Sequence, residues 1–364
     1  MQNGKSIGNF KFICHNRCIN KKQGDELCMS LFKSNRETFT FFDGEGNTIE
    51  RNTEVRFDPL TGESSRIVFD PGLPFSIPDY TEVAEQTKGP NCPFCSENVF
   101  KLTPLFPKEM VPEGRVTNGE AIVAPNLFPY SKYNGVTIMT KEHYVRLDEF
   151  SEVIIADAFR ASQMYIESVL KHEEKPLSVS INWNYLPHSG GSIIHPHQHI
   201  IISETETNYQ ANFNKQAKQF KAEHNEEYLT KLYEAEKAEG ARWIGERGNV
   251  AWLHAYAPKS HNDYLAIFRN KTSIDQITEA DWTDFAAGIK AVFASLTEQG
   301  LASFNMVMHF SNDGSPVHAR FIPRLVLNEL GTSDINFFQS LHQEPLVYKV
   351  PEEIAELARK HFPK

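Results

Sequence analysis

The sequence lacks long apolar runs, an excess of positive charge and a large number of cysteines, and each absence excludes a class of protein. No segment approaches the about 20 apolar residues that a membrane-spanning helix requires, so we expect no membrane partner. The 37 basic residues are outnumbered by 47 acidic ones, a net charge of −10, so the broad positive field that binds nucleic acids is missing. With 40% apolar and 23% charged residues, the 364-residue chain has the balance of a globular protein.

The cysteines are few and odd in number, which argues against a disulfide framework: Cys14, Cys18, Cys28, Cys92 and Cys95. We expect the first three to be free or buried thiols rather than a second metal site. The first residues, MQNGKSIGNFKFICHN, contain no apolar signal core, so the sequence predicts a cytoplasmic protein.

Two stretches of the chain show the same order of predicted elements, about 125 residues apart: two strands, a helix and two strands. In the first stretch these elements are expected over 120–126, 136–140, 151–172 (with Ser151 as N-cap), 177–183 and 197–203. In the second they are expected over 248–256, 264–268, 278–296, 304–310 and 317–323. The pattern predicts an α+β fold of two tandem units, each an antiparallel sheet with a packed helix.

Three histidines, His195, His197 and His199, stand at the entry to an apolar strand in the segment HPHQH. Because alternate residues of a strand face the same way, their imidazoles share one face. Burying three such rings is costly unless they bind something, and metal ligation and anion chemistry are two ways to satisfy them. The preceding turn, HSGGS (188–192), offers backbone N–H groups to a phosphate, since its two glycines carry no side chain.

A second motif, CPFC, places Cys92 and Cys95 at the spacing with which two thiolates bind one tetrahedral zinc ion from a tight turn. Such an ion needs two more ligands, and the candidates are His143, in the segment KEHYVRL, and His195.

The segment HPHQH resembles the active-site strand of the histidine triad superfamily, and most of all the galactose-1-phosphate uridylyltransferase branch, in which two such units are fused. Further segments resemble, in the same order and spacing, that family's N-terminal signature, zinc knuckle, nucleoside-contacting segment, third-ligand loop and catalytic stretch: RFDPLTGESSRIV (56–68), CPFC (92–95), IVAPNLFPYSKYNG (122–135), KEHYVRLDEF (141–150) and NYLPHSGGSIIHPHQH (184–199).

The resemblance implies one structural zinc ion per chain, held by Cys92, Cys95, His143 and His195. With four protein ligands such an ion has no open position, so it would fix the end of the strand rather than act as a Lewis acid. The resemblance also implies that His197 is the nucleophile, and the carbonyl of His195 or Pro196 is expected to accept its other ring N–H.

The resemblance further implies two groups of site residues. His197 is accompanied by His199 and Ser192 as catalytic residues. The substrate-binding positions are Asn184, Gly190 and Gly191 for the phosphates, Asn126 and Phe128 for the nucleoside, and Arg56, with Arg66, as additional phosphate partners.

The implied reaction is ping-pong transfer of a nucleoside monophosphate between a nucleoside diphosphate sugar and a hexose 1-phosphate, of the UDP-glucose and galactose 1-phosphate type. His199 stands where the family usually has glutamine, and histidine there is typical of hydrolytic branches. A phosphorylase or hydrolase of dinucleotides or nucleotide sugars is therefore the alternative. Leu127 replaces a frequent carboxylate, which leaves the base open. A non-catalytic nucleotide-binding protein is a third interpretation, against which the intact HPHQH argues.

We expect the chain to divide into four segments: an N-terminal extension (1–50), the catalytic unit with the zinc knuckle (51–205), a charged, solvated connecting helix (206–245) and a degenerate second unit (246–364). In the second unit His309 and His318 match positions that hold another metal in some members, but Arg320 replaces a histidine and the nucleophile. We expect neither metal nor catalysis there. The resemblance also implies a homodimer.

Overall fold

A computed structural model describes residues 31–70, 72, 77–175, 177–311, 314–327 and 331–363 of the chain. Its contacts define two units, Met1–Leu31 and Phe32–Lys364, and every helix and strand of the structure belongs to the second. The expected extension 1–50 and the cysteines Cys14, Cys18 and Cys28 therefore lie wholly or largely outside the described residues.

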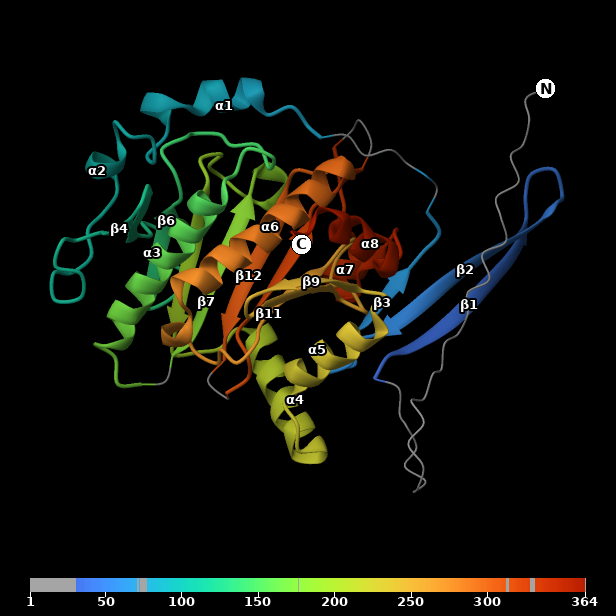
Figure 1. Ribbon diagram of the computed structural model, residues 1–364. Helices are drawn as coiled ribbons and strands as arrows, with labels where there is room; N and C mark the ends of the chain where they lie inside the picture. Colours follow the sequence, from blue (N-terminus) through green and yellow to red (C-terminus); the bar gives the residue numbers. More distant parts are fainter. Residues whose placement is uncertain are drawn as a thin grey trace. The chain divides into compact units, whose positions relative to one another are not determined.

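The centre of the second unit is an antiparallel sheet of ten strands in the order β4-β5-β6-β8-β7-β12-β13-β11-β10-β9 (Figure 1). The strands of its first half are β4 (Val116–Asn118), β5 (Ala121–Pro125), β6 (Tyr133–Ile138), β7 (Ser178–Tyr185) and β8 (His197–Ser203). Those of its second half are β9 (Trp243–Arg247), β10 (Val250–His254), β11 (Tyr264–Phe268), β12 (Phe304–Phe310) and β13 (His318–Pro323).

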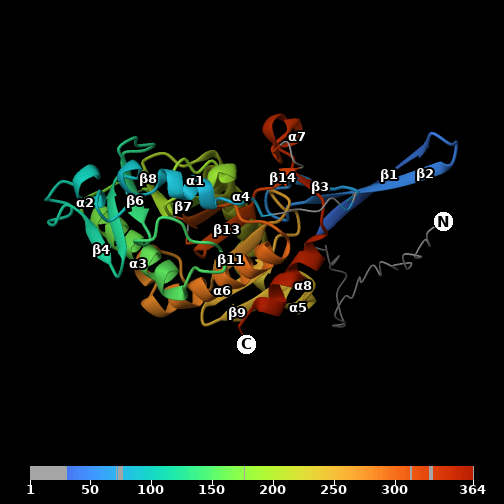
Figure 2. The same ribbon diagram turned by 90° about the horizontal axis from the view of Figure 1, so that it is seen from above.

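The two halves of the sheet repeat each other in mirrored order, as two copies of one unit would. Their innermost strands, β7 and β12, pair directly, with Asn305 opposite Asn184 and His309 opposite Ser180. The long helices α3 (Glu152–Leu170) and α6 (Glu279–Glu298) contact each other and cover the same face of the sheet (Figures 1 and 2). The predicted α+β class with two fused units is confirmed, and the two predicted sheets are halves of one continuous sheet.

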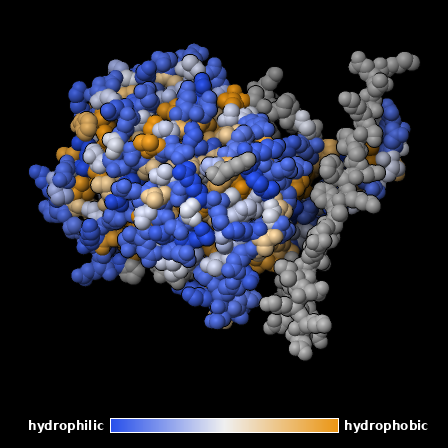
Figure 3. Space-filling view, viewed as in Figure 1, coloured by the Kyte–Doolittle hydropathy of each residue, from blue (hydrophilic) through white to orange (hydrophobic). Residues whose placement is uncertain are grey.

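Local sequence explains where these helices begin. The side chain of Ser151 accepts a hydrogen bond from the backbone N–H of Ile154, so Ser151 is the N-cap of α3, as predicted. Thr278 and Asp281 form a capping box at the start of α6. The apolar sides of both helices are buried against the sheet, and the outer face of the helical layer is largely hydrophilic (Figure 3).

Strand alternation divides the central strands between two environments. Trp183 on β7 and Phe304 on β12 face the helices and meet edge to face, with ring centroids 4.9 Å apart. The alternate residues face the opposite side of the sheet and form a polar surface, here called the polar face: Asn182, Asn184, His197, His199, Asn305, His309, His318 and Arg320. The expected site residues of β7 and β8 thus share one surface.

The predicted connecting helix is two helices, α4 (Asn208–His224) and α5 (Tyr228–Glu239). The first ends at Asn225, whose left-handed backbone (φ 52°) cannot continue a helix. The expectation of a purely solvated segment is also wrong for α4. Its Tyr209 and Phe213 stack on His309 and His318, with centroids 4.7 and 4.6 Å apart, so α4 covers part of the polar face.

Shorter elements surround this sheet. A four-stranded sheet contains β1 (Lys33–Phe42), β2 (Thr48–Phe57), β3 (Ser64–Ile67) and β16 (Leu346–Val347), and β14 (Val326–Leu327) pairs with β15 (Thr332–Ser333). The remaining helices are α1 (Thr81–Thr87), α2 (Val99–Leu102), α7 (Phe337–Leu341) and α8 (Pro351–His361), with 3₁₀ turns at Gly89–Asn91, Pro187–Ser189 and Ile274–Gln276. Among the described residues, no helix is long and apolar enough to cross a bilayer.

A buried ion-pair cluster ties β2 to α8. The carboxylate of Glu352 accepts hydrogen bonds from Arg56 at 2.8 Å and from Arg242 at 2.9 Å. Burial alone would raise the pKa of Glu352, but the two guanidinium groups outweigh it and lower that pKa to about 2. Because the pKa is lower in the folded chain, these pairs stabilise the fold above about pH 4.5, and their contribution is lost as the pH falls towards 2.

We predict that Glu352→Gln lowers the free energy of unfolding by about 3 kcal/mol at pH 7, since two buried guanidinium groups lose their shared carboxylate. The difference from the wild type should shrink to about 1 kcal/mol at pH 3, where the unfolded chain already binds the proton. Urea denaturation at both pH values measures it. Glu353→Gln, on the exposed side of the same helix, is the control, and an equal effect of both variants would contradict the prediction.

Candidate active site and metal centre

Four side chains that lie far apart in the sequence form one buried cluster. Cys92 and Cys95 come from the CPFC turn, His143 from the loop after β6, and His195 from the residues just before β8. Their ligand atoms all lie within 4.8 Å of one another. The Sγ of Cys95 is 3.4 Å from Nδ1 of His143, and the Sγ of Cys92 is 3.6 Å from Nδ1 of His195. The structure brings together all four predicted ligands, and the cluster can hold a metal ion.

Both imidazoles are oriented for ligation. His195 directs Nε2 to the carbonyl of Thr140 at 2.9 Å, and His143 directs Nε2 to the hydroxyl of Thr87 at 3.1 Å, so each presents Nδ1 to the cluster. Burial lowers the pKa of His195 to about 4, which keeps the ring neutral, as a ligand must be. Burial raises the pKa of the Cys92 thiol to about 11, and a bound dication is the ordinary means of ionising such a thiol. Two thiols and two imidazoles suit tetrahedral zinc.

His197 begins β8 and is buried, with 5% of its surface exposed. Its Nδ1 lies 2.8 Å from the carbonyl oxygen of His195. A carbonyl oxygen can only accept a hydrogen bond, so Nδ1 carries the proton and Nε2 carries the lone pair. Burial lowers the pKa of His197, which keeps the ring neutral. The predicted bond to a backbone carbonyl is present, and its acceptor is His195, a residue of the metal cluster.

Two rings flank the imidazole of His197. The ring of Phe94, between the two cysteines, lies 5.2 Å away centroid to centroid, and that of His199 lies 5.1 Å away. The CPFC turn therefore supports His197 both through His195 and by direct packing. His199 is next to Tyr130, at 5.7 Å, and burial lowers its pKa to about 4.

The glycine turn after β7 has a tightly defined backbone. Gly190 adopts φ 84°, a conformation that favours glycine, and a Cβ on Gly191 would lie only 3.0 Å from the carbonyl oxygen of Leu186, a tight contact. The N–H groups of both glycines bond within the turn, to the carbonyls of Pro187 and Leu186. The expectation that they are free to bind a phosphate is wrong, because they close the turn instead. The exposed Ser192 lies at the end of this turn.

Asn184, a predicted phosphate contact, is oriented by a residue that the sequence reasoning missed. Nδ2 of Asn305 donates to Oδ1 of Asn184 at 2.7 Å and to the carbonyl of Ser189 at 2.8 Å. Since the Ser189 carbonyl can only accept, the amide orientation of Asn305 is defined, and Asn184 must turn its oxygen towards it. The amino group of Asn184 therefore points away from Asn305 and can donate hydrogen bonds to another group. No motif marked Asn305, because its position opposite Asn184 follows only from the pairing of β12 with β7.

The predicted nucleoside segment forms a turn with exposed apolar side chains. Asn126 donates to Asn134 at 2.9 Å and accepts from the N–H of Phe128 at 3.1 Å, so it shapes the turn. Phe128 is 76% exposed, and Leu127 and Tyr130 are also exposed. Tyr130 lies beside His199, and the exposed rings of Tyr130 and Phe128 offer surfaces on which a base can stack.

Other predicted residues have partners elsewhere. Arg56 lies in the ion-pair cluster with Glu352, and Arg66 pairs with Glu37 and Glu344, each at 3.1 Å. The structure therefore does not bring either arginine to the histidine cluster within this chain. In the second unit Arg320 pairs with Asp263 at 3.0 Å.

We predict about one zinc ion per chain in metal analysis, and its loss in Cys92→Ser, because three donors no longer complete a tetrahedral site. The variant should also unfold at a lower temperature than the wild type, whereas chelation of the wild type should reproduce its behaviour. Cys14→Ser, outside the predicted ligand set, is the control. Two or more ions per chain, or full retention in Cys92→Ser, would contradict the account.

No protein-family model matches the chain. An uncharacterized protein of Archaeoglobus fulgidus is 33% identical over 320 residues, which cover 86% of this chain and 94% of that protein. Among solved structures, a GalT-like protein from Arabidopsis thaliana matches with a TM-score of 0.65 and 15% identity, over 84% of this chain and 98% of that one.

Two further structures are similar to the chain over most of its length. An ADP-glucose phosphorylase from Arabidopsis thaliana with bound ADP-glucose has a TM-score of 0.64 and 14% identity, over 85% of this chain and 99% of that one. A uridylyltransferase has a TM-score of 0.62 and 18% identity, over 85% and 98%. The three similar structures show the fold of the chain, and this fold agrees with the one that the motifs predicted. The chain belongs to one family with the Archaeoglobus fulgidus protein.

Proposed function

We propose that the protein is a nucleotidyltransferase that exchanges a nucleoside monophosphate between a nucleoside diphosphate sugar and a hexose 1-phosphate, through a nucleotidyl-His197 intermediate. The observation that carries the proposal is the hydrogen bond from Nδ1 of His197 to the carbonyl of His195, which makes Nε2 the nucleophilic atom. The same face of the sheet presents the amino group of Asn184 and ends at the glycine turn.

In the first half-reaction Nε2 attacks the α-phosphorus of the nucleotide sugar. A P–N bond forms, the P–O bond to the sugar phosphate breaks, and the sugar 1-phosphate leaves with the electron pair. The Nδ1 proton stays on the ring, and the His195 carbonyl stabilises the positive imidazolium that results. In the second half-reaction a phosphate oxygen of the acceptor attacks the same phosphorus and the P–N bond breaks.

In this proposal the four-residue cluster has a structural role and takes no direct part in the reaction. Zinc bound by Cys92, Cys95, His143 and His195 would have four protein ligands, and would supply a rigid anchor for the start of β8. His195 supplies the carbonyl that orients His197, so only Pro196 separates the anchor from the nucleophile along the chain.

The similar structures support this proposal by their names, which are a uridylyltransferase and an ADP-glucose phosphorylase with bound ADP-glucose. A phosphorylase or hydrolase that uses the same His197 is the second candidate function, and His199 favours it. Its ring lies 5.1 Å from that of His197, and Nδ1 of His199 has no hydrogen-bond partner among the described residues. A neutral imidazole there can accept a proton from an attacking phosphate or water.

We also propose that the protein forms a homodimer, as the resemblance implies, and that its partners are small nucleotides and sugar phosphates rather than nucleic acids.

We predict that radiolabelled UDP-glucose leaves label on the protein after an alkaline quench, because a P–N bond to imidazole survives base. His197→Gly should lose the label, since the attacking atom is gone. His172→Gly, an exposed histidine after α3, is the matched control. Absence of label from every nucleotide sugar tested would contradict the proposed function and favour a non-catalytic binding protein.

The acceptor is determined by clearing the labelled adduct. Galactose 1-phosphate, inorganic phosphate and buffer alone are added separately to the purified adduct. Clearance by the sugar phosphate supports transfer, clearance by phosphate supports phosphorolysis, and loss in buffer alone supports hydrolysis.

We predict that Asn305→Leu slows formation of the adduct by about tenfold or more, because the orienting hydrogen bonds to Asn184 and Ser189 are each worth about 1 kcal/mol. Zinc content and thermal unfolding, measured in parallel, should stay close to the wild type. An unchanged rate of nucleotidylation would show that Asn305 does not position Asn184.

A further inference from the structure

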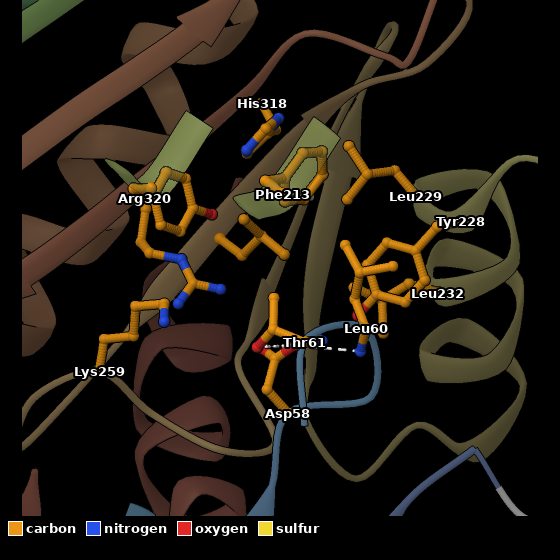
Figure 4. A pocket seen from close by; sticks show the side chains of 12 residues that line it. Asp58, Leu60, Thr61, Phe213, Tyr228, Leu229, Leu232, Lys259, His318 and Arg320 are labelled. Carbon is orange, nitrogen blue, oxygen red and sulfur yellow. Dashed lines mark hydrogen bonds between the residues drawn. The ribbon is translucent and has the colours of Figure 1, made fainter. Parts of the chain in front are cut away.

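Arg320, the predicted counterpart of His197 in the second unit, borders a pocket that is too small for a substrate. Figure 4 shows Arg320 and Lys259 on one side of this pocket, and Tyr228 and Leu232 of α5 on the other. Its volume of about 20 Å³ has room for about one water molecule. The second unit therefore takes no substrate in this pocket. It does contact the first unit, and two of these contacts meet at the turn after β7.

This turn contains a backbone conformation that is nearly confined to glycine. Leu186, where the turn begins, has φ 69° and ψ 163°. Such a conformation is costly for leucine and persists only where the surrounding structure holds it. The turn also connects Asn184, near the end of β7, to Ser192 and to the residues that lead into β8. Its shape therefore sets how Asn184 lies relative to His197.

Tyr80 contacts the turn from outside. Its hydroxyl oxygen lies 2.5 Å from Nδ1 of His188, within the turn, and 3.0 Å from the hydroxyl oxygen of Ser303, just before β12. A phenol can donate one hydrogen bond and accept others, so both contacts form at once, whichever group donates. Burial raises the pKa of Tyr80, which keeps the proton on its oxygen. The other contact from the second unit is the bond from Nδ2 of Asn305 to the carbonyl of Ser189 at 2.8 Å.

The helix that begins after Tyr80 is fixed at both ends. Tyr80 is the residue before the first turn of α1, and Ala84, one turn further on, is buried in the core with it. At the end of α1 the hydroxyl of Thr87 lies 3.1 Å from Nε2 of His143, a residue of the metal cluster. Figures 1 and 2 show α1 at the end of the sheet where β7 leads into the turn. The helix thus spans from the turn to the cluster and gives the phenol a rigid base.

We propose that Tyr80 is a positioning residue of the proposed reaction. Through His188 it holds the turn after β7 in its strained shape, and so fixes Asn184 relative to His197. The inference deepens the proposed function and rests on it for the kinetic consequence alone, since the shape of the turn can be tested without a substrate. Tyr80 lies outside the segments that resemble motifs of the family, and it acts through His188 rather than on the reacting atoms.

The test removes one oxygen atom. Tyr80→Phe is made in the full-length protein, and Tyr264→Phe is its matched control, because the buried phenol of Tyr264 also bonds to a serine, Ser295, at 3.0 Å. Hydrogen–deuterium exchange of the amides of Gly190 and Gly191 reports on the turn, since both donate to carbonyls within it. We expect their exchange to be at least about fivefold faster in Tyr80→Phe, the effect of one lost hydrogen bond, and unchanged in Tyr264→Phe.

The kinetic consequence is measured on the adduct. Nucleotidylation of His197 at saturating UDP-glucose should be at least about fivefold slower in Tyr80→Phe and unchanged in Tyr264→Phe. Zinc content should stay at the wild-type value in both variants, and their thermal unfolding should be alike, which separates a local role of the phenol from a general loss of stability. His188→Ala removes the other partner of the bond and replaces Tyr80→Phe if that protein does not fold. In the double variant the two effects should not add.

Unchanged exchange at Gly190 and Gly191 in Tyr80→Phe, or additive effects of the two variants, would overturn the inference. Faster exchange with an unchanged rate of nucleotidylation would overturn the positioning role, because the reaction would not depend on the held turn. Absence of an adduct in the wild type contradicts the proposed function instead, and the exchange data then still decide whether Tyr80 holds the turn.

Discussion

The hydrogen bond between Nδ1 of His197 and the carbonyl of His195 is the interaction on which the proposed chemistry depends. It decides which nitrogen of a buried, neutral ring carries the lone pair. The carbonyl belongs to His195, whose own ring is directed into the cluster with Cys92, Cys95 and His143. The position of this cluster therefore fixes His195, and His195 in turn orients the ring of His197. Phe94 of the CPFC turn strengthens this link by packing on the His197 ring.

The two units of the chain contribute differently to one surface. Pairing of β7 with β12 joins them into a single sheet, and this places Asn305 of the second unit against Asn184 of the first. In the second unit, the predicted counterpart of the nucleophile is Arg320, and α4 stacks aromatic rings on His309 and His318. In the proposed reaction, the second unit contributes by orienting Asn184 through Asn305.

Local patterns in the sequence were sufficient for the central fold. The capping Ser151, the apolar strand that starts with His197 and His199 and the second copy of the strand and helix order are visible within short windows, and they are present in the structure. The four residues of the cluster that can hold a metal also followed from motifs.

What could not be predicted depends on contacts between distant segments. Arg56 has an expected position in a motif, yet its partner Glu352 lies almost 300 residues away. The Asn305 to Asn184 bond likewise requires the pairing of β12 with β7, which no short window contains. The N–H groups of Gly190 and Gly191 were assigned to a ligand because sequence alone does not show which carbonyls close the turn.

The atom that bonds to phosphorus is the most direct test of this account. Phosphorus NMR of the isolated nucleotidyl-protein, with nitrogen-15 in its histidines, distinguishes a phosphorus on Nε2 from one on Nδ1 through the coupling between the two nuclei. The account predicts a single adduct on Nε2 of residue 197, because Nδ1 is held by the His195 carbonyl. Attachment through Nδ1, or to any other residue, would contradict it.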